Sequence, residues 1–193
     1  MAGEVLAQIN PSDLFRETSV GYVLAYQSGL YGKVQGQSRG LSLQKIPRDL
    51  VPVPSFINAE QPKEYYNGQW IVPAAVALAT GLTFRFMLTD DGTDPADLGK
   101  VVQLEVSPYN LSTAAAPVDW SLAASLGTAT TGNVTLSATS GAIVIASIAM
   151  VIANLKSLAA GNVFGMRLRR VGDAAADTCN GRVLLLGGVI TNT

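Results

Sequence analysis

Leu82-Thr83-Phe84-Arg85-Phe86-Met87-Leu88-Thr89 carries the clearest structural signal in this sequence. Leu82, Phe84, Phe86 and Leu88 alternate with mostly polar residues, which is typical of a β-strand that buries one face. The same period of two recurs in residues 102–106, 133–139, 164–169 and 182–190. Turn sequences such as Asp90-Asp91-Gly92 and Asn180-Gly181 separate these segments. The sequence therefore predicts an all-β fold, an antiparallel β-sandwich or jelly roll.

Two segments lack this alternation. Residues 142–153 are almost entirely apolar, which predicts either a strand covered on both faces or a short buried helix, followed by one helical turn at residues 155–158. Residues 183–186 are apolar on both faces of the expected last strand. A second sheet can cover one face, so we expect another subunit to cover the other. Leu184 and Leu186 are therefore candidate interface residues.

The composition changes near Gly68, which divides the chain into an arm (1–67) and a sandwich domain (68–193). Asn10-Pro11-Ser12-Asp13 predicts the start of a short helix that runs to about Thr18. A short strand can follow within residues 20–30, and the prolines of residues 46–62 favour extended chain over a packed strand. We expect an extended, largely irregular arm that grips a neighbour through single apolar anchors, which are Leu14, Phe15, Leu50, Val53 and Phe56.

Charged residues make up only 14% of the chain and hydrophobic residues 48%. A soluble chain averages about 25% charged residues, so we expect part of the surface to face another subunit. A net charge of −1 provides no basic field for nucleic acid. The longest apolar run, residues 142–153, is too short to span a membrane. The first ten residues do not resemble a signal peptide, and Cys179 is the only cysteine, so we expect synthesis in a cytoplasm.

The chain contains no histidine. Catalysis of the Ser-His-Asp and Cys-His kinds and the common zinc sites are therefore excluded, whereas chemistry based on paired carboxylates stays open. We expect no catalytic residue, no cofactor and no metal. Cys179 is expected to be a chemically inert thiol, because no imidazole is available to activate it.

Three clusters have both a functional and a structural interpretation. Asp90, Asp91, Asp94 and Asp97 could bind Ca²⁺, but their spacing is not that of an EF-hand, so an ordinary turn is favoured. Arg167, Arg169 and Arg170 could form salt bridges between chains, or could pair locally with Asp173 and Asp177. Aromatic residues could form a glycan-binding face, although packing is favoured: Tyr65, Tyr66, Trp70, Tyr109 and Trp120.

Residues 164–189 contain Arg167-Leu168-Arg169-Arg170, then Gly172-Asp173-Ala174-Ala175-Ala176-Asp177-Thr178, then Leu185-Leu186-Gly187. This order resembles the end of jelly-roll modules in tailed-bacteriophage virion proteins, and Trp70-Ile71-Val72-Pro73 resembles the way such modules open. The resemblance implies a virion protein made in the host bacterial cytoplasm.

Within that family the resemblance favours a capsid cement (decoration) protein that binds the major capsid protein at the capsid surface, commonly as a homotrimer. The alternative within the family is a head-fibre, tail or baseplate module that binds a host receptor or glycan. A glycan hydrolase that uses two carboxylates is the alternative from the enzyme class.

Overall fold

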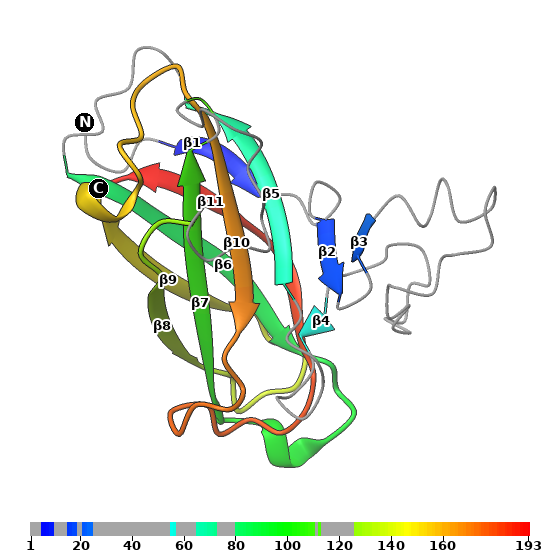
Figure 1. Cartoon of the computed structure of the whole chain (residues 1–193). Coiled ribbons are helices and arrows are strands. Elements are labelled where there is room, and N and C mark those ends of the chain that lie inside the picture. The colour runs from blue at the N-terminus through cyan, green and yellow to red at the C-terminus, as the bar shows by residue number, and fades with distance from the viewer. Residues whose placement is uncertain are drawn as a thin grey trace.

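The structure of the protein is a computed structural model that describes residues 5–9, 15–18, 21–24, 55–56, 65–72, 80–110, 112 and 126–193. These residues form eleven strands and two short 3₁₀ turns (Figure 1). The elements are β1 (Val5–Ile9), β2 (Phe15–Thr18), β3 (Gly21–Leu24), β4 (Ser55–Phe56), β5 (Tyr65–Ile71), β6 (Gly81–Asp90), η3 (Pro95–Asp97), β7 (Val101–Asn110), β8 (Thr130–Thr135), β9 (Val144–Val151), η5 (Ile152–Asn154), β10 (Val163–Arg170) and β11 (Val183–Asn192).

The strands form two antiparallel sheets that lie one behind the other (Figure 1). Sheet A has the order β1-β11-β6-β9, with β4 also paired to β11, and sheet B has the order β3-β2-β5-β10-β7-β8. Strands β1, β5, β6 and β7 pair with β11, β10, β9 and β8 respectively, as in one long hairpin rolled into two layers. This connectivity is that of a jelly roll, and the predicted all-β sandwich is confirmed.

The core forms where the alternation predicted it. Leu82, Phe84, Phe86 and Leu88 of β6 are at most 1% exposed. Phe84 meets Phe164 of β10 across the core, with ring centroids 5.9 Å apart, and Phe164 stacks on Trp70 of β5 at 6.1 Å. Trp70 also donates its indole N–H to the carbonyl of Gln8 in β1, 3.1 Å away. Trp70 therefore joins sheet B to the first strand of sheet A.

Strand β1 lies inside the sandwich, although its residues were predicted to belong to the arm. It pairs with β11 from Val5 opposite Thr191 to Ile9 opposite Gly188, and Ile9 is buried in the core. Residues 10–64 are therefore a long insertion between the first two jelly-roll strands, β1 and β5, and are anchored at both ends.

The helix predicted from Asn10 to about Thr18 is wrong for its second half. Phe15–Thr18 forms β2, which pairs with both β3 and β5 and so extends sheet B. Strand β3 falls within the expected short strand of residues 20–30. Ser55–Phe56 pairs with the start of β11, so part of the proline-rich stretch is hydrogen-bonded to sheet A. Tertiary pairing overrides the local capping signal here.

Residues 144–151 of the apolar run 142–153 form a strand and its last two residues belong to η5, so neither sequence alternative is correct in full. Strand β9 buries Ala146, Ile148 and Met150, while Ile145 and Val151 are 61% and 58% exposed. One face of this apolar strand is therefore open. The helical turn expected at residues 155–158 is displaced to η5, and the chain then turns through Lys156 and Ser157, which both have positive φ.

Candidate functional site: a closed polar network and an open sheet face

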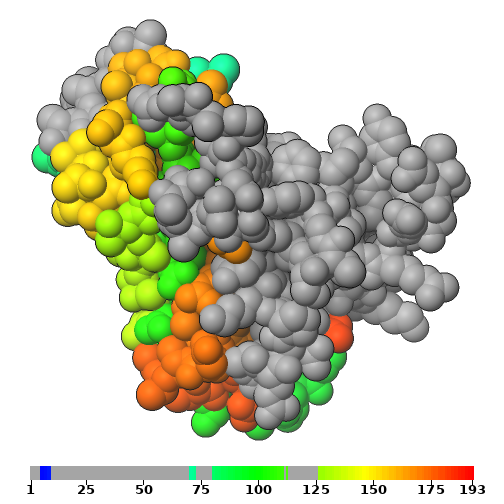
Figure 2. Space-filling model, viewed as in Figure 1, coloured from blue at the N-terminus to red at the C-terminus, as the bar shows by residue number. Residues whose placement is uncertain are grey.

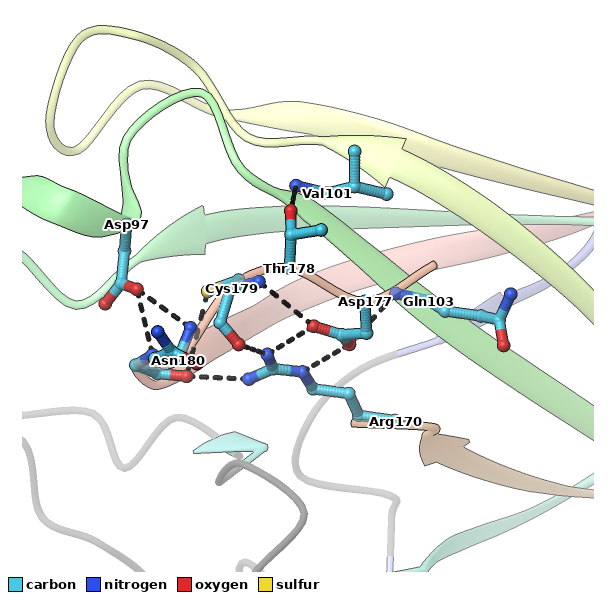
Figure 3. A network of polar contacts seen from close by, with 9 residues as sticks. Asp97, Val101, Gln103, Arg170, Asp177, Thr178, Cys179 and Asn180 are labelled. Atoms are coloured by element: carbon cyan, nitrogen blue, oxygen red, sulfur yellow. Dashed lines mark hydrogen bonds and ion pairs between the residues drawn. The ribbon is translucent and has the colours of Figure 1, made fainter. Parts of the chain in front are cut away.

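A polar network closes one end of the sandwich, where the loop between β10 and β11 meets η3 and the start of β7 (Figure 3). Its centre is Arg170, whose Nε and Nη2 bind Oδ2 and Oδ1 of Asp177 at 2.7 and 2.6 Å. Both side chains are at most 1% exposed. Arg170 Nη1 donates to the carbonyl of Gly181 at 2.6 Å, and Nη2 donates to the carbonyl of Cys179. The guanidinium therefore holds both the acid and the loop backbone.

Asp177 and its neighbours connect this centre to β7. Asp177 accepts the backbone N–H of Gln103 at 3.1 Å, and Thr178 Oγ1 accepts that of Val101 at 3.0 Å. On the other side, Asp97 of η3 accepts the N–H groups of Asn180 and Gly181, each at 3.0 Å. Two segments that are far apart in the chain, residues 97–103 and residues 170–181, are thus fixed together just before β11 begins.

The electrostatics of the network oppose chemical reactivity. Burial alone would lower the pKa of Arg170, but the hydrogen bond and the charge of Asp177 raise it, so the ion pair is maintained. Burial raises the pKa of the Cys179 thiol to about 11. The charge of Arg170 acts to lower this pKa, whereas the carboxylates of Asp97 and Asp177 act to raise it. Cys179 is 1% exposed. This environment keeps the thiol protonated and out of contact with solvent.

The four acids from the end of β6 to the end of η3 all accept hydrogen bonds from groups of the same chain. Asp90 is buried and accepts from Gly141 N at 2.7 Å, Ser140 Oγ at 2.8 Å and Gly92 N at 2.9 Å. Burial would raise the pKa of Asp90, but these hydrogen bonds lower it below its usual value. Asp91 accepts from Thr93, Asp94 caps η3 through Ala96 N, and Asp97 belongs to the polar network. The geometry supports the turn interpretation.

The other predicted interface residues lie in different places. Arg169 forms a bidentate pair with Glu105 on the neighbouring strand β7, at 2.6 and 2.9 Å, and Arg167 lies half-buried on β10 opposite Ser107. Leu184 is buried within the single chain, and Leu186 is partly buried at a register shift in β11. Leu14, Leu50 and Val53 lie outside the described residues, whereas Phe15 and Phe56 belong to β2 and β4.

The aromatic residues do not form a glycan-binding face among the side chains that the structure describes. Trp70 packs on Phe164 in the core, and Tyr109 is fully buried against Gly165, where an added Cβ would lie 1.8 Å from its ring. The side chains of Tyr65 and Tyr66, and all of Trp120, lie outside the description.

The open outer face of sheet A was not predicted from the sequence. Large apolar side chains are exposed there on β9, just before it and on β6, and these are Ile143, Ile145, Val151 and Met87. The apolar run of residues 142–153 contained the signal, but it was interpreted as buried on every side. This face is the part of the described surface best suited to contact another molecule.

The described residues also bear on metal binding and on membrane insertion. Within the described ranges, no three His, Cys, Asp or Glu side chains gather in a way that could hold a metal ion. No helix in the described part of the chain has the length and apolar character needed to cross a membrane.

No protein-family model and no curated protein matches this sequence.

Proposed function

We propose that this chain is a virion structural protein, a capsid cement protein that joins neighbouring subunits of the major capsid protein and acts as a homotrimer. The proposal starts from the resemblance of residues 164–189 to phage jelly-roll modules. In this function the protein acts by non-covalent binding. It raises the free energy needed to separate the capsid subunits that it bridges.

The observation that carries the proposal is how the chain distributes its charged and apolar groups. Arg170, Asp177, Arg169 and Glu105 pair within the chain, and Asp90 is used to hold a turn. At the same time, Ile145 and Val151 stay exposed on the outer face of sheet A. Polar groups committed to internal structure beside an exposed apolar face favour a role in assembly over a role in catalysis.

The insertion of residues 10–64 supplies the proposed capsid-binding element. Between β3 and β4 it contains Lys33, Arg39, Lys45 and Arg48 against a single acid, Asp49. A segment with this charge suits an acidic capsid surface. Because each copy contributes one such segment, three weak contacts combine into strong binding through effective concentration.

Co-sedimentation with capsids that lack this protein tests the proposal. The variant replaces residues 27–52 with a flexible Gly/Ser linker of about ten residues and keeps β1 to β4. A deletion from the N-terminus is unsuitable, because it removes β1 from sheet A. We expect the variant to keep its β-rich circular dichroism and to lose capsid binding, and we expect capsids without the protein to rupture at lower temperature.

A charge variant tests whether the basic residues of the insertion are the groups that bind the capsid. Replacing Lys33, Arg39, Lys45 and Arg48 with Gln should weaken capsid binding and reduce its dependence on salt, because fewer ion pairs form. If the linker variant still covers capsids at full occupancy, the insertion is not the attachment element. If the intact protein binds host cells or glycans and not capsids, the receptor-binding alternative replaces the cement function.

A further inference from the structure

Asn180 and Gly181 form one of the two Asn-Gly pairs in the chain, and Asn67-Gly68 is the other. Such a pair is prone to spontaneous deamidation, because glycine has no side chain to shield its backbone nitrogen from the preceding amide. Asn180 is exposed, and Figure 2 shows the orange residues of the loop between β10 and β11 at the surface at the lower end of the molecule. Its sequence and its exposure therefore mark Asn180 as a site of chemical modification.

Deamidation uses the backbone nitrogen of Gly181 as its nucleophile. This nitrogen loses its proton to a solvent base and forms a bond to Cγ of Asn180, while the Cγ–Nδ2 bond breaks and the side-chain amide leaves as ammonia. Water then opens the five-membered imide at either carbonyl, which returns a proton to the nitrogen and leaves aspartate or isoaspartate. One water is consumed and one ammonia is released. The step depends on bringing the nitrogen onto Cγ, so the geometry of the backbone controls its rate.

Asp97 holds this nitrogen in the folded protein (Figure 3). The N–H of Gly181 donates to Oδ1 of Asp97 at 3.0 Å, and the N–H of Asn180 donates to the same atom at 3.0 Å. Asp97 is 3% exposed. A buried carboxylate that accepts an N–H stabilises its protonated form, and its negative charge opposes the amide anion that must form for the attack.

Arg170 holds the same stretch of backbone through its carbonyl groups. Its Nη1 donates to the carbonyl of Gly181 at 2.6 Å, and its Nη2 donates to the carbonyl of Cys179. The peptides on both sides of Asn180 are therefore fixed. A rotation that brings the Gly181 nitrogen onto Cγ would have to break contacts with both Asp97 and Arg170.

The close approach of Asp97 also explains why residue 181 is a glycine. A Cβ at this position would lie 1.8 Å from Oδ2 of Asp97. A larger residue would displace the carboxylate from both N–H groups that it accepts. The packing that protects Asn180 thus requires the very neighbour that makes it vulnerable when the loop opens.

We propose that Asn180 is a deamidation site that Asp97 keeps closed in the folded protein. The Gly181 nitrogen is released when the loop between β10 and β11 opens locally, so the rate of deamidation follows the population of the open loop. Isoaspartate lengthens the backbone by one methylene and adds a carboxylate near Asp97, so the original contacts cannot form again. Deamidation therefore makes the opening of this loop irreversible, whether or not the chain is a cement protein.

Peptide mass spectrometry on the full chain at mildly alkaline pH tests the proposal, with both Asn-Gly pairs measured in one sample. Asn67-Gly68 lies within β5, between β2 and β10, and so reports the opening of sheet B. In Asp97→Ala we expect Asn180 to react at least about tenfold faster than in the wild type, which corresponds to about 1.4 kcal/mol, and Asn67 to keep its wild-type rate. The matched control Glu105→Gln removes a carboxylate that pairs with Arg169 outside the network, and both rates should stay unchanged.

Two results for a folded Asp97→Ala variant would overturn the proposal. One is a wild-type rate at Asn180, and the other is equal acceleration at Asn180 and Asn67, which would mean that the whole domain opens. If circular dichroism shows that Asp97→Ala does not fold, Asp97→Asn takes its place, because it keeps the shape of the side chain and removes the charge. Asn180 should again react faster than in the wild type, and an unchanged rate would refute the role of Asp97. Equal rates for the folded wild type and for the wild type unfolded in urea would show that the site is not closed at all.

Discussion

Replacing Asp177 with Asn is the most direct test of the polar network. The change leaves the Arg170 guanidinium at the end of the sandwich without its counter-charge, where the two side chains are 1% and 0% exposed. Removing one partner of a buried ion pair costs about 3–5 kcal/mol, and no reduction for solvent screening applies at this exposure. With a urea slope of about 1–3 kcal/mol/M, the unfolding midpoint should fall by about 1 M or more.

Glu105→Gln is the matched control for this experiment. It also breaks a bidentate pair with arginine, but Arg169 and Glu105 are 16% and 17% exposed, so its cost should be about 1 kcal/mol or less. The double variant Arg170→Met/Asp177→Leu should recover only part of the loss. In this double variant the carbonyls of Cys179 and Gly181 lose the Arg170 donor. Each carbonyl left buried and unpaired lowers the stability by about 1–3 kcal/mol. Urea unfolding followed by circular dichroism measures all three variants. An Asp177→Asn cost no larger than that of Glu105→Gln would refute the reasoning.

Two further predictions concern Asp90 and β1. Because the pKa of Asp90 is lowered on folding, its stabilisation is present above the unfolded pKa of about 3.9 and is lost as the pH falls through the folded value. Asp90→Asn should therefore be less stable than the wild type at pH 7, with a difference that shrinks below about pH 4 in urea titrations; a constant difference would contradict this. Deleting residues 1–9 should give aggregated protein in size-exclusion chromatography, since it removes the buried Ile9 and exposes the edge of β11, and a soluble, cooperatively folding product would contradict it.

The sequence predicted the parts of the fold that depend on local pattern. The alternation around Phe84 identified β6 and the face that it buries, because a strand with one covered face must alternate. Strand β1 could not be found in this way. Its residues Val5–Ile9 lack clear alternation, and their position depends on pairing with β11 near the other end of the chain.

The same distinction applies to the candidate site. The pairing of Arg170 with Asp177 was one of two sequence alternatives, because the residues are seven positions apart. The contact of Asp97 with Asn180 spans 83 positions, and the pair of Arg169 with Glu105 depends on the register of β7 and β10. For β9, composition indicated burial but could not show which face the rest of the chain covers.

The central position of β11 in sheet A has a consequence during protein synthesis. Strand β11 lies between β1 and β6, yet it is the last strand of the sandwich to leave the ribosome. At about 5–20 residues per second, β1 waits about 10–40 s for the strand with which it pairs. Sheet B can assemble once residue 170 has emerged, whereas the pair of β6 and β9 stays open along its β11 edge until residues 183–192 follow. Nascent chains stalled before residue 183 should therefore be the form most dependent on chaperones.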